Sequence, residues 1–139
     1  MIARADDNPM SEAGKILLVE DEQPLLQLIE KYLHRLGYHV ESHAKSIDAL
    51  RNFEAAPASY SLVIADLGMP DMTGDTLLTR MLEIQPRLRI LVCSGSPFFI
   101  ENLPETLQKQ VAFLQKPFVP KMLGEAVERL LRGPTPPPR

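Results

Sequence analysis

Leu62-Val63-Ile64-Ala65-Asp66, near the middle of the chain, is an uninterrupted apolar run that ends in a carboxylate. Such a run is typical of a strand buried on both faces of a sheet. Ile16-Leu17-Leu18-Val19 shows the same pattern and leads into Glu20-Asp21-Glu22. Because both faces of such a sheet must be covered by helices, these segments predict an α/β fold.

Segments with helical spacing alternate with the apolar runs along the chain. Strands are expected over residues 16–19, 38–42, 62–65, 88–93 and 111–114. Helices are expected from Pro24 to Leu36, from Ser46 through Phe53, from about Asp75 to Gln85 and from Pro120 to Leu131. The Ser46 hydroxyl is expected to cap its helix, and Pro97 and Pro104 allow only a short or late helix within residues 95–110. This order, βαβαβαβαβα, predicts a doubly wound, mostly parallel sheet with helices on both faces.

The composition is that of one globular domain. The chain has 139 residues, 45% of them hydrophobic and 24% charged, close to the average for folded proteins. Its formal net charge of −3 argues against a dedicated nucleic-acid surface. No apolar run approaches the roughly 20 residues of a membrane helix, and the single cysteine, Cys93, fits a reducing compartment. We expect a soluble cytoplasmic domain over residues 15–132, a flexible segment over 1–14 and a proline-rich disordered tail over 133–139.

Polar side chains follow the strands at the edge where sites form in sheets of this type. Glu20 and Asp21 follow the first strand and Asp66 the third, while Ser94 follows the fourth and Lys116 the fifth. Because sites in open α/β sheets lie beyond the carboxyl ends of the strands, these side chains should converge. Three carboxylates together repel one another and need a hard divalent cation, such as Mg²⁺, to stay ionised. One carboxylate can then attack phosphorus to form an acyl phosphate, while the cation, the lysine and the hydroxyl neutralise the transferred group.

Four motifs in this order resemble the receiver domain of bacterial two-component response regulators, the CheY-like fold. They are Ile16-Leu17-Leu18-Val19-Glu20-Asp21-Glu22, Val63-Ile64-Ala65-Asp66-Leu67-Gly68-Met69-Pro70-Asp71-Met72-Thr73-Gly74, Val92-Cys93-Ser94-Gly95 and Phe113-Leu114-Gln115-Lys116-Pro117-Phe118. The resemblance covers about Lys15 to Arg132. It implies a receiver domain over residues 15–132, with a (βα)5 flavodoxin-like fold whose five-stranded parallel sheet has the order 2-1-3-4-5.

The resemblance also implies the roles of the acidic residues. Asp66 looks like the phosphoacceptor. Asp21 and Asp66 would hold Mg²⁺ or Mn²⁺ directly, together with the backbone carbonyl of Gly68, and Glu20 would act mainly through a bound water. Glu20 stands where an aspartate is most common in the family, and its charge is the same.

Three further residues match the parts of the family that respond to phosphorylation. Ser94 matches the hydroxyl that turns toward the phosphoryl group, and Phe113 matches the aromatic side chain that turns inward with it. Lys116 matches the lysine that pairs with the phosphoryl oxygens, and its bond to Pro117 is often cis in the family. Such a bond would aim the lysine amine over the rim of the sheet.

Besides Glu20, one residue and one segment depart from the family pattern. Gly68 lacks the side chain usually found two residues after the phosphoacceptor, so we expect water to reach the acyl phosphate and its lifetime not to be exceptional. The segment 96–110 lacks the regular fourth helix, and its Phe98, Phe99 and Ile100 are expected to pack over the neighbouring face or to dock a partner. The charged pairing pattern of transcription-factor members is not found there, so the chain looks closer to receivers of hybrid histidine kinases or to stand-alone receivers.

The leading functional hypothesis is a phosphorylatable signalling switch in a phosphorelay. A sensor histidine kinase or a histidine phosphotransfer protein would donate to Asp66, and an output protein of unknown identity would read the change. The domain would not be an enzyme beyond catalysing its own phosphorylation and dephosphorylation, and we expect neither direct nucleic-acid binding nor membrane insertion.

Two other classes stay open. A pseudo-receiver would be a pure protein-binding module, although the acceptor, the acids and the lysine are all present. A magnesium-dependent phosphatase or nuclease generally needs an Asp-x-Asp pair, whereas Asp66-Leu67-Gly68 supplies one acid. The histidines show no metal-ligand arrangement and are expected at the surface. They are His34, His39 and His43.

Overall fold

The computed structural model describes residues 14–132. Five parallel strands form one sheet in the order β2-β1-β3-β4-β5. The strands are β1 (Lys15–Val19), β2 (Val40–His43), β3 (Tyr60–Asp66), β4 (Ile90–Ser94) and β5 (Val111–Gln115). The helices are α2 (Gln23–Arg35), α3 (Ser46–Ala55), α4 (Gly74–Ile84), α5 (Glu105–Gln108) and α6 (Pro120–Arg132), with short 3₁₀ helices η2 (Pro57–Ser59) and η3 (Ile100–Asn102). The predicted α/β fold and strand order are confirmed.

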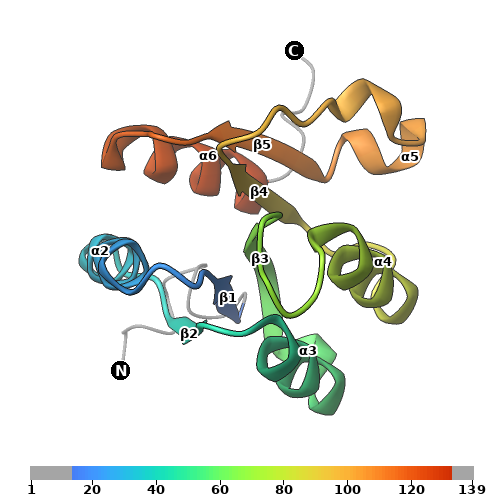
Figure 1. Cartoon of the computed structure of the whole chain (residues 1–139), viewed down its shortest axis with the longest axis horizontal. Helices are drawn as coiled ribbons and strands as arrows, with labels where there is room; N and C mark the ends of the chain where they lie inside the picture. Colours follow the sequence, from blue (N-terminus) through green and yellow to red (C-terminus); the bar gives the residue numbers. More distant parts are fainter. Residues whose placement is uncertain (1–13, 133–139) are drawn as a thin grey trace, which may run out of the picture.

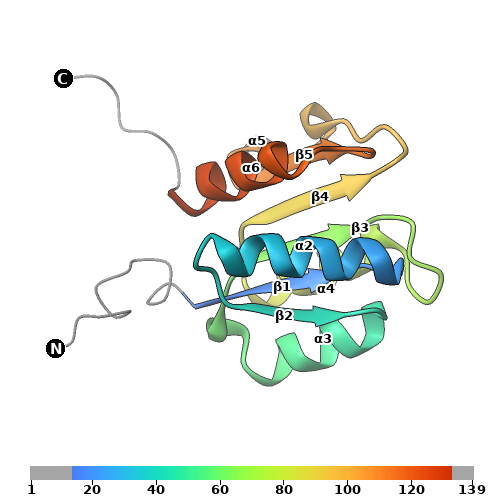
Figure 2. The same cartoon turned by 90° about the vertical axis from the view of Figure 1, so that its left-hand side faces the viewer.

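The helices cover the two faces of the sheet, α2 and α6 on one and α3 and α4 on the other (Figures 1 and 2). Side chains of β1 alternate between these two layers. Ile16 and Leu18 pack with α2 and α6, whereas Leu17 and Val19 pack with α3 and α4. All four are at most 1% exposed, which explains why the strand is apolar without interruption.

Residues 95–110 hold only η3 and the four-residue α5, as the two prolines predict.

The second strand begins at Val40 rather than at residue 38, because Gly37 and Tyr38 end α2. Gly37 has a φ of +97°, and its N–H donates to His34 O while the Tyr38 N–H donates to Leu33 O. This pair of bonds is a Schellman motif, which needs a residue in the left-handed region after the helix.

Two other expectations are wrong. Ser46 does not cap α3, because Lys45 holds the N-cap position and the buried Ser46 hydroxyl has no hydrogen-bond partner. The carboxylate of Asp71, 25 residues away, accepts from the first N–H groups of α3 instead. His43 is half-buried rather than at the surface, and its Nε2 lies 2.8 Å from Glu41 Oε2. The cap depends on a contact between residues 25 apart, whereas Glu41 and His43 are only two residues apart on β2.

The predictions for the two ends concern residues 1–13 and 133–139, which lie outside the described part. Cys93 is buried, as expected for a small apolar side chain. Among the described residues, no helix has the length and hydropathy needed to cross a bilayer.

Candidate functional site

The predicted site residues meet at the carboxyl edge of the sheet. Parallel pairing sets Val19 beside Ala65, Asp66 beside Cys93 and Ser94 beside Gln115, so the strands end at the same edge. Glu20 and Asp21 follow β1 directly, and Asp66 is the last residue of β3.

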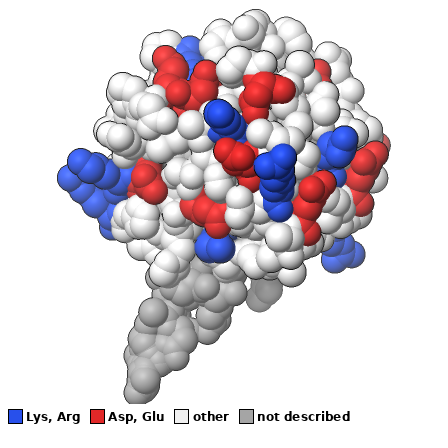
Figure 3. All heavy atoms as spheres, turned by 60° about the horizontal axis from the view of Figure 1, so that its bottom comes forward, with Lys and Arg blue, Asp and Glu red and all other residues white. Residues whose placement is uncertain are grey.

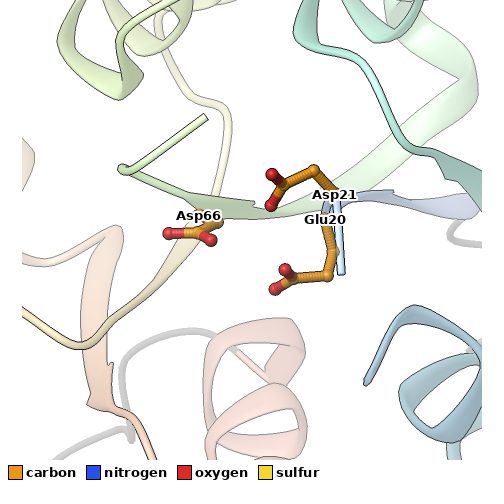
Figure 4. Close-up of side chains that lie close together, drawn as sticks. All are labelled: Glu20, Asp21 and Asp66. Atoms are coloured by element: carbon orange, nitrogen blue, oxygen red, sulfur yellow. The ribbon is translucent and has the colours of Figure 1, made fainter. Parts of the chain in front are cut away.

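The three acids form one cluster (Figure 4). Each of Glu20, Asp21 and Asp66 offers a carboxylate oxygen, and these three oxygens lie within 4.8 Å of one another. Glu20 is 2% exposed and Asp66 is 8% exposed, whereas Asp21 is open to solvent. Two buried carboxylates and one exposed carboxylate therefore share one small volume.

Lys116 is the cation that faces this cluster. Its Nζ lies 2.9 Å from Glu20 Oε1 and 3.0 Å from Asp66 Oδ2, and the exposed Glu22 Oε1 is 3.5 Å away. Burial by itself lowers the pKa of Lys116, but the bonds to Glu20 and Asp66 outweigh it, so the pKa is raised. The ammonium group is therefore charged at neutral pH. The peptide bond to Pro117 is cis, as the resemblance implies.

For Glu20, in contrast to Lys116, burial outweighs the hydrogen bonds in setting the pKa. Burial is the largest influence and raises the pKa of Glu20, while the bonds from Lys116 and from the Glu22 N–H lower it and the charge of Asp66 raises it again. The net result is a raised pKa. One lysine does not neutralise the cluster, so the site attracts a further positive charge.

The donor set fits a divalent metal ion. Carboxylate oxygens are the hard ligands that Mg²⁺ prefers, and Mg²⁺ is held by few protein groups with water completing the shell. Gly68 lies next to the acceptor carboxylate, since its N–H donates to Asp66 Oδ1 at 2.9 Å. A Cβ at residue 68 would lie 3.7 Å from that oxygen. The use of the Gly68 carbonyl as a ligand stays a prediction.

The two expected switch residues lie on neighbouring strands. Ser94 is 4% exposed, and its Oγ accepts the N–H of Ser96 at 3.1 Å, so the hydroxyl proton remains free to be donated. The half-buried Phe113 ring packs against Phe98 at a centroid distance of 5.9 Å. Phe98 thus packs over the neighbouring face, which was one of its two expected roles.

Sequence reasoning assigned no role to Glu22 or Asp71. Glu22 approaches Lys116 because the chain turns from β1 into α2 beside the cluster. Asp71 follows Pro70 in the loop after Asp66, and acidic residues in such turns commonly accept backbone N–H groups. That chemistry was the available signal, but it does not say which N–H groups are bound.

The chain is similar to proteins of known function and structure. It is 32% identical over 143 residues to the sensor kinase CckA of Brucella abortus, an alignment that covers 92% of this chain and 15% of CckA. It is 31% identical over 117 residues to the response regulator receiver protein CpdR of the same organism, covering 84% of this chain and 96% of CpdR. The crystal structure of a response regulator receiver domain protein from Clostridium thermocellum has a TM-score of 0.74 at 27% identity and covers 86% of this chain and 94% of that one.

A family model for the response regulator receiver domain matches residues 16–128. This range contains all of the site residues and reaches from β1 into α6. With the fold, the acidic cluster and the lysine in place, the chain belongs to the response regulator receiver domain family of two-component systems.

Proposed function

We propose that Asp66 accepts a phosphoryl group from a phosphohistidine of a sensor histidine kinase or a histidine phosphotransfer protein, in a reaction that depends on Mg²⁺ or Mn²⁺. One observation carries the proposal. The buried Asp66 carboxylate has Oδ2 on Lys116 and Oδ1 on the Gly68 N–H, beside two further acids. A carboxylate held in this way is oriented for attack, as a nucleophile must be.

In the transfer step a carboxylate oxygen of Asp66 attacks phosphorus. The bond between phosphorus and the imidazole nitrogen breaks, and its electron pair stays on that nitrogen. Lys116, already 3.0 Å from the carboxylate, neutralises a phosphoryl oxygen, and the Ser94 hydroxyl donates to another. Glu20, Asp21, Asp66 and the Gly68 carbonyl would hold the metal ion, which supplies further charge neutralisation on the transferred group.

Dephosphorylation is a separate hydrolysis that consumes one water. Water attacks the phosphorus of the acyl phosphate, the bond to the Asp66 oxygen breaks, and the products are the carboxylate and inorganic phosphate. We propose that the domain promotes only its own phosphorylation and dephosphorylation and is not an enzyme for other substrates. We further propose that Ser94 and Phe113 change position with the phosphoryl group and alter the surface that an output protein binds.

We expect this signalling to take place in the cytoplasm without direct contact to nucleic acid. Basic and acidic side chains are interspersed on the face shown in Figure 3, with no continuous basic area there. The net charge of −3 supports the same view, because nucleic-acid surfaces carry a basic excess.

The first experiment is the intact mass of the protein after incubation with Mg²⁺ and acetyl phosphate. We expect one phosphoryl adduct on the wild type, and none on Asp66→Asn or without a divalent cation. No adduct together with no Mg²⁺ binding would favour a pseudo-receiver. Continuous release of phosphate from unrelated phosphoesters would favour a phosphatase-type enzyme. If Mg²⁺ binds without an adduct, binding of beryllofluoride tests whether the acceptor site is competent.

A further inference from the structure

Asp71 connects the loop that follows β3 to the first turn of helix α3 through hydrogen bonds. Its Oδ1 accepts the Ser46 N–H at 3.2 Å and its Oδ2 accepts the Ile47 N–H at 3.0 Å. Both oxygens of one carboxylate are therefore used on the first turn of α3. The loop itself, residues 67–73, runs from Asp66 to the start of α4.

Helix α3 has no acceptor of its own for these groups. The first N–H groups of a helix lack intrahelical partners and are usually capped by a nearby serine, threonine, aspartate or asparagine. Here the N-cap residue is Lys45, whose side chain makes no capping bond, and within residues 14–132 no hydrogen bond is found for the Ser46 hydroxyl. The cap of α3 is thus supplied by the loop that follows the phosphoacceptor.

The same loop is also held at other points, of which Gly68, Met69 and Gly74 are three. Gly68 donates its N–H to Asp66 Oδ1, and Met69 is buried in the core on the α3 and α4 side. Gly74 closes the base, since its N–H donates to Leu67 O at 3.3 Å and a Cβ there would lie 2.7 Å from Leu67 Cα. Among the hydrogen bonds found for the described residues, those from Ser46 and Ile47 attach residues 69–72 to the rest of the domain, and Met72 also packs against the core.

We propose that Asp71 is a positioning residue for the acidic site: by capping α3 it holds the loop so that Gly68 stays against the Asp66 carboxylate. This proposal deepens the proposed function and rests on it for its metal-binding part. Coupling of this kind is reciprocal, so a cation bound by Glu20, Asp21 and Asp66 also orders the first turn of α3. Burial by itself raises the pKa of Asp71, but the bonds from Ile47 and Ser46 outweigh it and the pKa is lowered, so the cap is charged at neutral pH.

The simpler explanation is a cap that only stabilises α3, and a pair of variants separates the two. Asp71→Ala removes the cap. Adding Lys45→Ser supplies a local cap at a residue whose extended backbone, with φ −125° and ψ 136°, already suits one. The double variant also restores the net charge of the wild type, because one negative and one positive charge are lost. Lys45→Ser alone is the matched control.

We expect Asp71→Ala to lower the urea midpoint and to weaken Mg²⁺ binding by about tenfold, as is typical when a group that orients metal ligands is removed. The double variant should regain the urea midpoint and keep the weak Mg²⁺ binding, measured by calorimetry. Recovery of both properties in the double variant, or unchanged Mg²⁺ binding in Asp71→Ala, would overturn the proposal.

A second readout needs no metal ion. Amide hydrogen exchange of Gly68, followed by NMR in metal-free buffer, should be faster in Asp71→Ala and in the double variant than in the wild type and in Lys45→Ser. Equal rates in all four proteins would overturn the positioning role. A wild type that binds no Mg²⁺ and forms no adduct would instead overturn the proposed function, and the exchange rates would still decide the role of Asp71.

Discussion

Two clusters in this molecule each pair a glutamate with a lysine, and the pKa values of the two glutamates are shifted in opposite directions. The edge cluster consists of Lys15, Glu41, His43 and Tyr60 on β1, β2 and β3. Lys15 Nζ lies 3.1 Å from Glu41 Oε1, and the Tyr60 hydroxyl donates to Oε2 at 2.8 Å. His43 Nε2 is also 2.8 Å from Oε2. Burial raises the pKa of Glu41, but these three partners outweigh it, so the pKa is lowered.

The site cluster, formed by Glu20, Asp21, Asp66 and Lys116, has fewer donors and more negative charge. Glu20 receives bonds from Lys116 and from one backbone N–H, and it has Asp66 as a neighbour. Burial therefore prevails, and the pKa of Glu20 is raised. Burial and the number of partners together, rather than the presence of a lysine, therefore decide whether a carboxylate is satisfied. The edge cluster is complete, and the site cluster is left in need of a cation.

The largest expected difference between the clusters is in phosphorylation. Asp66→Asn should abolish the phosphoryl adduct, because the attacking oxygen is lost, whereas Glu41→Gln should form the adduct to the wild-type extent. Intact mass after incubation with Mg²⁺ and acetyl phosphate measures both. An adduct that survives in Asp66→Asn would place the acceptor elsewhere.

The second largest expected difference between the two clusters is in how much Mg²⁺ stabilises the fold of their variants. At a free Mg²⁺ concentration of ten times Kd, a ligand that binds only the folded state raises the free energy of unfolding by about 1.4 kcal/mol. We expect this gain in the wild type and in Glu41→Gln, and none in Asp21→Asn, whose exposed side chain tolerates the change. Urea unfolding with and without Mg²⁺ checks it. A gain of equal size in Asp21→Asn would remove that residue from the metal site.

Without metal, the two glutamates should respond to neutralisation in opposite ways. Glu41→Gln should lower the free energy of unfolding at pH 7 by about 1–2 kcal/mol, because charge-assisted bonds are lost. Glu20→Gln should leave it unchanged or raise it, because a buried charge beside Asp66 disappears while an amide oxygen still faces Lys116. If Glu20→Gln lowers the free energy of unfolding as much as Glu41→Gln does, the proposed difference between the two clusters is wrong.

The pH dependence of these two variants sharpens the test. The folded-state pKa of Glu41 lies below its ordinary value of 4.5, so its stabilisation is present above pH 4.5 and is lost as the pH falls further. The folded-state pKa of Glu20 lies above 4.5, so its contribution favours the fold below pH 4.5 and is lost as the pH rises through that pKa. Between pH 7 and pH 4.5, urea midpoints of the wild type and Glu20→Gln should converge, while those of the wild type and Glu41→Gln should stay apart.

The smallest expected effect concerns the lifetime of the acyl phosphate. A side chain at residue 68 would lie against Asp66, since even a Cβ would be 3.7 Å from its Oδ1. Gly68→Asn should therefore hinder water and slow the loss of the adduct severalfold, which a mass time course after removal of the phosphodonor measures. Faster loss in the variant would contradict an open path for water at Gly68.

Much of the fold was predictable because its signals are local. Ile16–Val19 and Leu62–Ala65 are apolar without interruption, and such short runs are typical of strands covered on both faces. The prolines at 97 and 104 predicted the short helical segments η3 and α5. The acids and Lys116 were predictable as a group, because parallel strands bring their carboxyl ends to one edge.

Contacts between distant segments were not predictable in this way. Ser46 looked like a helix cap because serine commonly is one, yet Asp71 takes that role from 25 residues away. His43 looked like a surface residue, and its contact with Glu41 on the same strand is local. What the sequence did not show is that Lys15 and Tyr60, from β1 and β3, meet the same carboxylate. Phe98 packing on Phe113 likewise depends on how the loop after β4 folds back.

The strands, their helical cover and the set of polar residues at the carboxyl edge can all be read from the amino-acid sequence, since each depends on spacing along the chain. The tertiary structure alone decided which charges pair. Glu20 and Glu41 are the same residue type with a lysine nearby, and their opposite pKa shifts follow from burial and from donors contributed by other strands. Burial and partner number are properties of the folded arrangement, because they depend on groups that only folding brings together.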